Sequence, residues 1–400
     1  MYRSLLVLAT GVFAIGTDSF VIAGILPQMA ASLHVGTAAA GQLITAYALA
    51  YAVLSPVMGA LTGNWPRKRL LVTGLAVFVL GNLATVTLPV FGLVLAGRIV
   101  AGAGGAMVTP AANAAGAALA PPEKRGRAIA LVMTGLSAAT ALGSPLGTAL
   151  AGLTGTWRAT ILFIAAVGLL SMLGVASLLP SIAAPVPLGL RERLTPVADA
   201  RVMLTLGTTL LVYTGLFSVY SYIGIGFDRV THGDGTTLAL LLLVWGLAAT
   251  AGTLGSGRLT DRLGNRRVLN TAVAVAAIDF ALLPWSSRYL ATSVLALVVW
   301  GLCGWGALTP QTHRLLSVFP HLAPVLTGLA SATVYVGVSL AAAVGALGMA
   351  AVGPYGLGPF AAVLIALGLV CAELAHSAIR RREAPDRAAA PAVAAARRAE

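Results

Sequence analysis

Charged residues are scarce in this 400-residue chain: they make up 9% of it, against 58% for hydrophobic residues. Soluble globular domains carry roughly 25% charged residues, so this scarcity indicates an integral membrane protein. The few charges are mostly basic, with a formal net charge of +13. Because the basic residues lie in short gaps between apolar runs and are not gathered on one polar domain, we expect no nucleic-acid partner.

Cysteine and several functional motifs are also rare or absent. The two cysteines, Cys303 and Cys371, fall inside apolar runs, so no disulfide framework is predicted. The chain has no Gly-x-x-x-x-Gly-Lys-Ser/Thr loop, which disfavours ATP-driven transport. Its five histidines show no metal-ligand spacing, and no catalytic polar cluster or sizeable soluble domain is visible. We therefore expect no metal, no cofactor and no enzymatic activity.

Long apolar runs are what the chain has instead. A bilayer is crossed by about 20 helical residues, and twelve runs are near or above that length: 5–26, 38–60, 70–88, 91–115, 128–150, 159–179, 202–226, 238–255, 268–284, 291–310, 324–352 and 360–378. The first could be a cleaved signal peptide, but it is too long and leads directly into another span. The predicted domains are an N-terminal six-helix bundle (1–179), a Pro-rich cytoplasmic linker (180–200), a C-terminal six-helix bundle (201–379) and a disordered cytoplasmic tail (380–400).

A repeated segment relates the two halves. GALTGNWPRKRLL, residues 59–71, returns roughly 200 residues later as GRLTDRLGNRRVL, residues 257–269. Such a repeat indicates a duplicated membrane domain, as in transporters built from parallel halves. With a cytoplasmic N-terminus, only Arg158, Arg229 and Arg288 fall at the outer face. The positive-inside rule therefore predicts that both termini lie in the cytoplasm, with the chain crossing the membrane many times.

Twelve spans with a basic loop after the second and the eighth resemble the major facilitator superfamily. Its cytoplasmic loop motif is Gly-x-x-x-Asp-Arg-x-Gly-Arg-Lys. The first copy departs from it, with Gly63, Asn64 and Pro66 at the positions of the motif's Asp, Arg and Gly. That Asp261 of the second copy compensates for the missing aspartate is a hypothesis. The resemblance implies an all-α membrane fold of two pseudo-symmetric six-helix bundles. It also implies conformational roles for the matching residues, namely Gly59, Arg67, Lys68, Gly257, Asp261, Arg262, Gly264 and Arg266.

Span five carries GSPLGT, residues 143–148, which resembles the Gly-Pro signature of the antiporter branch. Gly and Pro are tolerated in membrane helices where neighbours cover the freed backbone groups, and small residues let helices approach closely. We expect Gly143, Pro145 and Gly147 to let this helix pivot against its partner. The alternative is that they only pack tightly.

Two ionisable residues lie deep within spans. Asp18 belongs to GTDSFVIAGILP, which together with residues 41–57 resembles the drug and sugar efflux branch, including arabinose-efflux and chloramphenicol-resistance proteins. Arg98 resembles the span-four arginine linked with proton transfer in drug antiporters. An intramembrane Arg costs ~3 kcal/mol on insertion scales and normally faces a cavity or an anionic partner, for which Asp18 is the best candidate. We predict that Asp18 and Arg98 couple protons to transport; the alternatives are an Arg98 that reaches the outer headgroups and an Asp18 held in permanent hydrogen bonds.

The resemblance places the substrate cavity between spans one, four, seven and ten, assisted by two, five, eight and eleven. Mostly aromatic and apolar side chains on these spans suit a moderately hydrophobic ligand, and the candidates are Phe20, Tyr47, Tyr51, Met107, Asn113, Phe217, Tyr220, Trp245, Trp300, Trp305 and Tyr335. We expect proton-coupled efflux of a small lipophilic drug such as chloramphenicol, with sugar or metabolite efflux and uncoupled facilitation as alternatives. The expected partners are a small-molecule substrate, protons and the lipid bilayer, and the protein is expected to be a monomer. The contributions of Asp279 and Glu373 are left open.

Overall fold

The computed structural model of the chain describes residues 2–62, 65–121, 125–182, 195–319 and 322–399. Within these ranges every regular element is a helix. The first half contains α1 (Tyr2–Ser32), α2 (Thr37–Leu61), α3 (Arg67–Thr87), α4 (Phe91–Ala118), α5 (Arg125–Ala138), the π-helix η2 (Ala139–Gly143), α6 (Ser144–Thr154) and α7 (Trp157–Leu178). The second half contains η3 (Thr195–Ala198), α9 (Ala200–Tyr220), α10 (Ile223–Gly226), α11 (Asp228–Thr231), α12 (Gly235–Leu263), α13 (Asn265–Ser286), α14 (Leu290–Gly306), α15 (Leu308–Val318), α16 (Ala323–Val352), η5 (Pro354–Gly356) and α17 (Leu357–Ala399).

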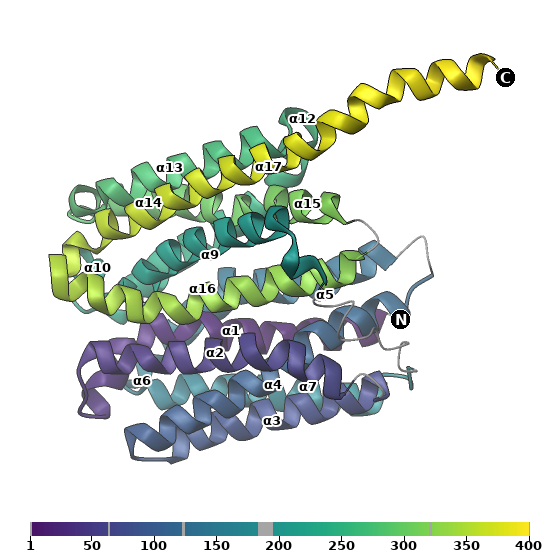
Figure 1. Cartoon of the computed structure of the whole chain (residues 1–400). Coiled ribbons are helices and arrows are strands. Elements are labelled where there is room, and N and C mark those ends of the chain that lie inside the picture. Colours follow the sequence, from purple (N-terminus) through teal and green to yellow (C-terminus); the bar gives the residue numbers. More distant parts are fainter. Residues whose placement is uncertain (1, 63–64, 122–124, 183–194, 320–321, 400) are drawn as a thin grey trace.

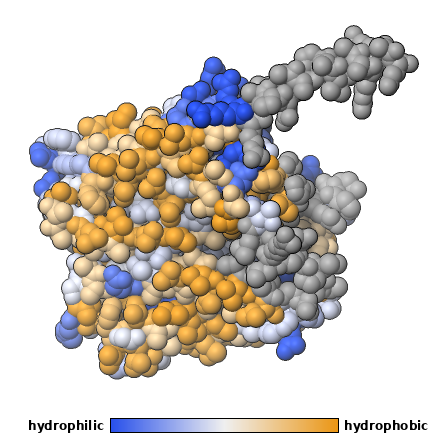
Figure 2. All heavy atoms as spheres, viewed as in Figure 1, coloured by the Kyte–Doolittle hydropathy of each residue, from blue (hydrophilic) through white to orange (hydrophobic). Residues whose placement is uncertain are grey.

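Twelve helical segments of the described chain are long and apolar enough to cross a membrane, which confirms the predicted fold class. The fifth consists of α5, η2 and α6 in succession, and the tenth consists of α14 and α15. Apolar side chains cover much of the face seen in Figure 2, and hydrophilic residues gather toward its edges.

Several spans are longer than the sequence predicted. Helix α1 continues to Ser32 instead of residue 26, and α12 continues to Leu263 instead of residue 255. Polar residues at the membrane surface do not stop a helix, so hydropathy alone places such ends too early. Helix α12 ends only where Gly264 adopts φ 82°, a left-handed conformation that glycine adopts without steric cost.

The two halves stack as two groups of helices, with α16 of the second half lying along α2 of the first (Figure 1). The N-terminus and the C-terminus lie toward the same end of the bundle, as an even number of spans requires (Figure 1). Most of the predicted linker, residues 183–194, lies outside the described residues. The division into two bundles and a linker therefore remains a prediction about domain boundaries.

The last helix extends beyond the predicted span. Helix α17 continues to Ala399, and its final part is rich in alanine, which has the strongest intrinsic preference for helix. The disorder expected for residues 380–400 stays a prediction.

We call the contact surface between the two halves the seam. The Thr45 hydroxyl donates to the Ser339 carbonyl oxygen at 3.0 Å, and the Tyr220 hydroxyl donates to the Phe20 carbonyl oxygen at 3.0 Å. The hydroxyls of Ser144 and Tyr220 lie 3.3 Å apart. These hydrogen bonds lie in the middle of the spans and toward the end opposite the termini.

The other end of the seam is more open. Helix α12 packs against η2 and α6 of the first half, but it has few contacts with α5, which lies toward the termini. The described contacts therefore hold the halves together at the end predicted to face outward, and leave space at the end predicted to face the cytoplasm.

Candidate functional site

Asp18 and Arg98, the two charges predicted to meet, form a buried ion pair. Asp18 Oδ1 lies 2.5 Å from Arg98 Nη1, and their side chains are 0% and 1% exposed. Arg98 Nη2 also donates to the Asp18 carbonyl oxygen at 3.3 Å. Arg98 therefore does not extend to the outer headgroups. Removing a charge from water is costly unless it is paired, so each group stabilises the other.

Two further side chains surround this pair. Asn82, on α3, donates from Nδ2 to Asp18 Oδ2 at 3.4 Å, and the Arg98 guanidinium lies 4.5 Å from the centre of the Tyr47 ring. The sequence analysis missed Asn82, although it is the only amide in the apolar run 70–88. Arg98 Nε and Asn82 Oδ1 have no hydrogen-bond partner among the described residues. The site therefore contains one donor and one acceptor that are free to form further hydrogen bonds.

Close packing of α3 against α4 positions Arg98. A β-carbon on Gly97 would lie 2.7 Å from Thr85 Oγ1, and one on Gly81 would lie 2.8 Å from the Gly97 carbonyl oxygen. Because both positions are glycine, the two backbones approach without such clashes. This packing brings Arg98, which follows Gly97, beside Asn82 and α1.

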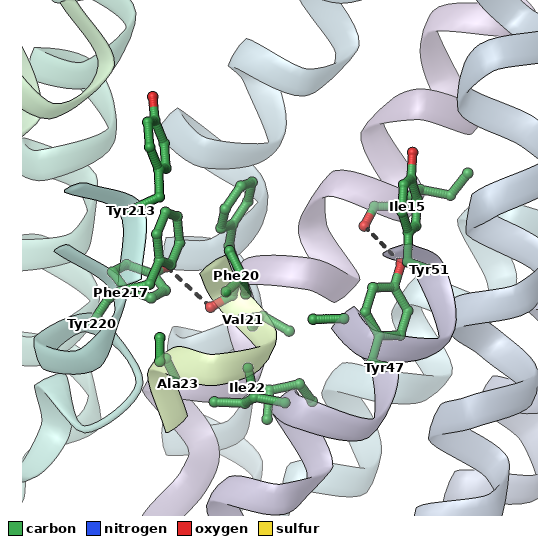
Figure 3. Close-up of a cluster of buried hydrophobic side chains, with 14 of the residues drawn as sticks. Ile15, Phe20, Val21, Ile22, Ala23, Tyr47, Tyr51, Tyr213, Phe217 and Tyr220 are labelled. Carbon is green, nitrogen blue, oxygen red and sulfur yellow. Dashed lines mark hydrogen bonds between the residues drawn. The ribbon is translucent and has the colours of Figure 1, made fainter. Parts of the chain in front are cut away.

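Phe20 points the opposite way from Asp18, because two residues of an α-helix differ by about 200° around its axis. The Phe20 ring packs among aromatic rings of the second half (Figure 3), with its centroid 6.0 Å from Phe217 and 5.8 Å from Trp305. We call this group the aromatic cluster; it consists of Phe20, Tyr213, Phe217, Tyr220, Trp245, Trp300 and Trp305. The Trp245 Nε1 donor is buried and has no described partner.

Five of the predicted substrate-binding residues therefore meet Phe20 in one cluster. Tyr213 was missed, although its spacing from Phe217 places the two rings on one face of α9. The small cavity between the rings holds about 10 Å³, so the cluster is packed in this structure and no substrate-sized chamber lies within it.

Helix α2 links the ion pair to the second half. Tyr47 lies against Arg98, and Tyr51, one turn further on, stacks on Tyr335 of α16 with the ring centroids 3.7 Å apart. Figure 3 shows Tyr47 and Tyr51 on the other side of α1 from the rings of Tyr213, Phe217 and Tyr220. Ion pair and aromatic cluster are thus neighbours, separated by α1.

Met107 and Asn113 are not part of the cluster. The Met107 β-carbon lies 2.9 Å from where a β-carbon of Gly74, on α3, would be. Asn113 is half-buried, and its Oδ1 has no described partner. Their predicted contact with substrate therefore rests on the resemblance alone.

The Gly-Pro motif of span five packs against α1. A β-carbon on Gly147 would lie 2.6 Å from Val21, and one on Gly143 would collide with Thr17 Oγ1, so the motif lies directly on α1. Pro145 occupies the first turn of α6. The π-helix η2 before it contacts α12, where a β-carbon on Gly246 would collide with the Thr140 carbonyl oxygen. A π-turn interrupts the regular hydrogen-bond ladder and is a common place for a helix to bend.

The basic loops lie at the end of the helix bundle that also carries the two termini. In the second copy, Gly257 lies on α12, Gly264 separates α12 from α13, and Asp261 and Arg262 are exposed. Among the described residues the loop's ion pair joins Arg266 to Glu373 and leaves Asp261 out.

In the first copy, the Arg67 backbone N–H donates to the Ile182 carbonyl oxygen at 3.0 Å, and Lys68 is half-buried. Gly59 lies on α2, but its surroundings and residues 63–64 fall outside the described part of the chain.

Comparisons with known proteins agree with this architecture. The sequence profile of the Major Facilitator Superfamily matches residues 8–342. The inner membrane transport protein YdhP of Escherichia coli strain K12 is 30% identical over 88% of this chain and 90% of its own. A chloramphenicol resistance protein of Streptomyces lividans is 32% identical over 64% of this chain and 67% of its own.

A solved structure has the same fold. The crystal structure of a bacterial homolog of the human lysosomal transporter Spinster matches with a TM-score of 0.77 and 17% identity, over 95% of this chain and 97% of that one. The profile match spans both halves of the bundle, and the relatives include bacterial inner membrane transporters. The chain belongs to the Major Facilitator Superfamily of membrane transporters.

Proposed function

We propose that this transporter exports a small lipophilic compound, such as chloramphenicol, in exchange for protons. The observation that carries the proposal is the buried Asp18–Arg98 pair on the opposite side of α1 from the aromatic cluster. An ionisable group inside a membrane span is costly, and it commonly marks an ion or proton pathway.

The coupling step would act on the charge of Asp18. A proton that neutralises the carboxylate removes the attraction that holds Arg98 at 2.5 Å, and the freed guanidinium remains against the Tyr47 ring. Since Tyr51 on the same helix stacks on Tyr335, a shift of α2 would change this contact between the two halves. Loss of the proton to the cytoplasm would restore the pair and reset the cycle of alternating access.

The chemistry of the cluster supports a lipophilic substrate. Its rings come from α1, α9, α12 and α14, and they offer large apolar surfaces with few polar groups, among them the Tyr220 hydroxyl and the unpartnered Trp245 Nε1. Binding of a sugar would call for several amides and carboxylates. The name of the Streptomyces lividans relative, a chloramphenicol resistance protein, also favours antibiotic export over sugar efflux.

The orientation follows from the basic loops. We place both termini in the cytoplasm of a bacterial cell, because the loops that share their end of the bundle carry Arg67, Lys68, Arg262 and Arg266. The more open end of the seam then faces the cytoplasm, where an exporter must collect its substrate.

Transport by purified protein in vesicles with an imposed pH gradient tests the proposal. We expect chloramphenicol to move uphill when the gradient is present, and Asp18→Asn to permit downhill movement only. Asp234→Asn, which makes the same change at the exposed N-cap of α12, where asparagine caps as well as aspartate, is the matched control and should retain uphill movement. Wild-type flux that is downhill and independent of the gradient would exclude coupling, and unchanged coupling in Asp18→Asn would remove Asp18 from it.

A further inference from the structure

The second half contains a basic cavity of about 840 Å³ at the end that carries the termini. It lies between the α12–α13 turn, α15 and α17, and it is separate from the aromatic cluster. Its lining includes three arginines, Arg266, Arg267 and Arg314, and the carboxylate of Glu373. The cavity therefore carries an excess of positive charge.

Arg314 is the unusual member of this set because it is only 4% exposed. Its Nη1 donates to the Ala372 carbonyl oxygen at 3.0 Å, but its Nη2 has no hydrogen-bond partner among the described residues. A buried charge without an anionic partner destabilises the folded protein. An anion in the cavity would remove this cost.

Glu373 does not fill that role, because both of its oxygens are already used. Arg266 Nε donates to Oε1 at 3.0 Å and Arg266 Nη2 donates to Oε2 at 2.5 Å, in a bidentate pair. Asn270 Nδ2 also donates to Oε1. Within the described chain, Glu373 is the only carboxylate that lines the cavity.

Asn270 leaves a second unused group in the same cavity. Because its Nδ2 donates to a carboxylate, its Oδ1 is fixed as an acceptor, and this oxygen is buried without a described partner. The cavity thus offers an unused cationic donor and an unused neutral acceptor. A ligand that satisfies both carries an anionic oxygen and a hydrogen-bond donor, for which a hydroxyl is suited.

We propose that this cavity binds a phosphate group together with a hydroxyl. In the phosphatidylglycerol headgroup the hydroxyl belongs to the glycerol next to the phosphate, and in free dihydrogen phosphate it belongs to the phosphate itself. Arg314 Nη2 would donate to a phosphate oxygen, Asn270 Oδ1 would accept from the hydroxyl, and Arg267 would add long-range attraction. The cavity lies at the cytoplasmic end of membrane helices, where basic pockets between helices commonly bind anionic lipid headgroups. The inference does not depend on which substrate is transported.

Lipid binding measured by native mass spectrometry of the detergent-purified protein tests this site. Phosphatidylglycerol should bind the wild type at least about tenfold more tightly than phosphatidylcholine, which lacks the net charge and the hydroxyl. Arg314→Gln should abolish this preference. Because a change at a buried residue can impair folding, Arg267→Gln at the exposed rim is a second variant, with an expected several-fold loss. Arg262→Gln, an exposed arginine outside the cavity lining, removes the same charge and should bind like wild type.

Competition with inorganic phosphate separates the two sources. Displacement of phosphatidylglycerol by millimolar phosphate would identify a free anion as the ligand, and its absence would identify the lipid. Equal binding of the two lipids by wild type, or a preference for phosphatidylglycerol that survives in both Arg267→Gln and a folded Arg314→Gln, would overturn the site.

Discussion

Tyr51 of α2 and Tyr335 of α16 stack face to face across the seam, with ring centroids 3.7 Å apart and an interplanar angle of 19°. The two rings belong to different halves of the duplicated chain. One turn before Tyr51, Tyr47 lies against the arginine of the buried ion pair. The stacked pair is therefore a contact that must break, or slide, if the halves rock apart at this level.

Removal of the stacked ring should loosen the seam. Tyr335→Ala loses a pair worth about 0.5–1.5 kcal/mol beyond burial, whereas Tyr335→Phe keeps it. We expect chloramphenicol transport in vesicles to change several-fold in Tyr335→Ala and to stay near wild type in Tyr335→Phe. Equal activities of the two variants would show that the ring contact has no part in the transport cycle.

Breaking the ion pair should cost more stability than removing it. Arg98→Met leaves Asp18 buried without its cation, a change that costs about 3–5 kcal/mol in buried pairs. The double variant Asp18→Asn with Arg98→Met removes both charges and should recover part of that loss. Thermal unfolding of the purified protein measures both. A double variant less stable than the single one would contradict the paired arrangement.

Tryptophan fluorescence should report substrate at the aromatic cluster. Three of the six tryptophans, Trp245, Trp300 and Trp305, belong to the cluster, so a bound aromatic drug should quench the emission. Trp245→Phe should reduce the quenching substantially. Trp285→Phe is the control, because Trp285 is 60% exposed on α13. Equal quenching in both variants would place the substrate elsewhere.

Glycine substitutions should separate the tight helix contacts from the open ones. Gly246→Ala places a methyl group against the Thr140 backbone, so we expect impaired packing of α12 on η2 and a lower thermal stability. Gly255→Ala on the same helix meets no atom within 4 Å and should be neutral or slightly stabilising, since alanine favours helix by roughly 1 kcal/mol over glycine. Similar unfolding temperatures for the two variants would contradict the close approach of η2.

The sequence predicted the features that carry a strong physical signal. Span number followed from apolar length, and the pairing of Asp18 with Arg98 followed from the high cost of a charge inside a membrane. Asn82 was missed because a neutral amide within a span has no comparable cost. Its role depends on how α3 and α4 align, which composition does not record.

Other features could not be predicted from the sequence for similar reasons. The π-turn at η2 is a shift in backbone hydrogen bonding, and residue type does not fix it. Arg314 and Glu373 come from distant segments, and only the packed helices bring them to one cavity.

The back-to-back placement of Asp18 and Phe20 has a mechanical consequence. A rotation of α1 about its long axis turns both side chains through the same angle, so a small twist that draws the carboxylate away from Arg98 also shifts the Phe20 ring among its aromatic neighbours. A change at the ion pair and a change at the aromatic cluster would therefore follow from one rigid-body rotation of α1, and no chain of side-chain movements between the two sites is needed.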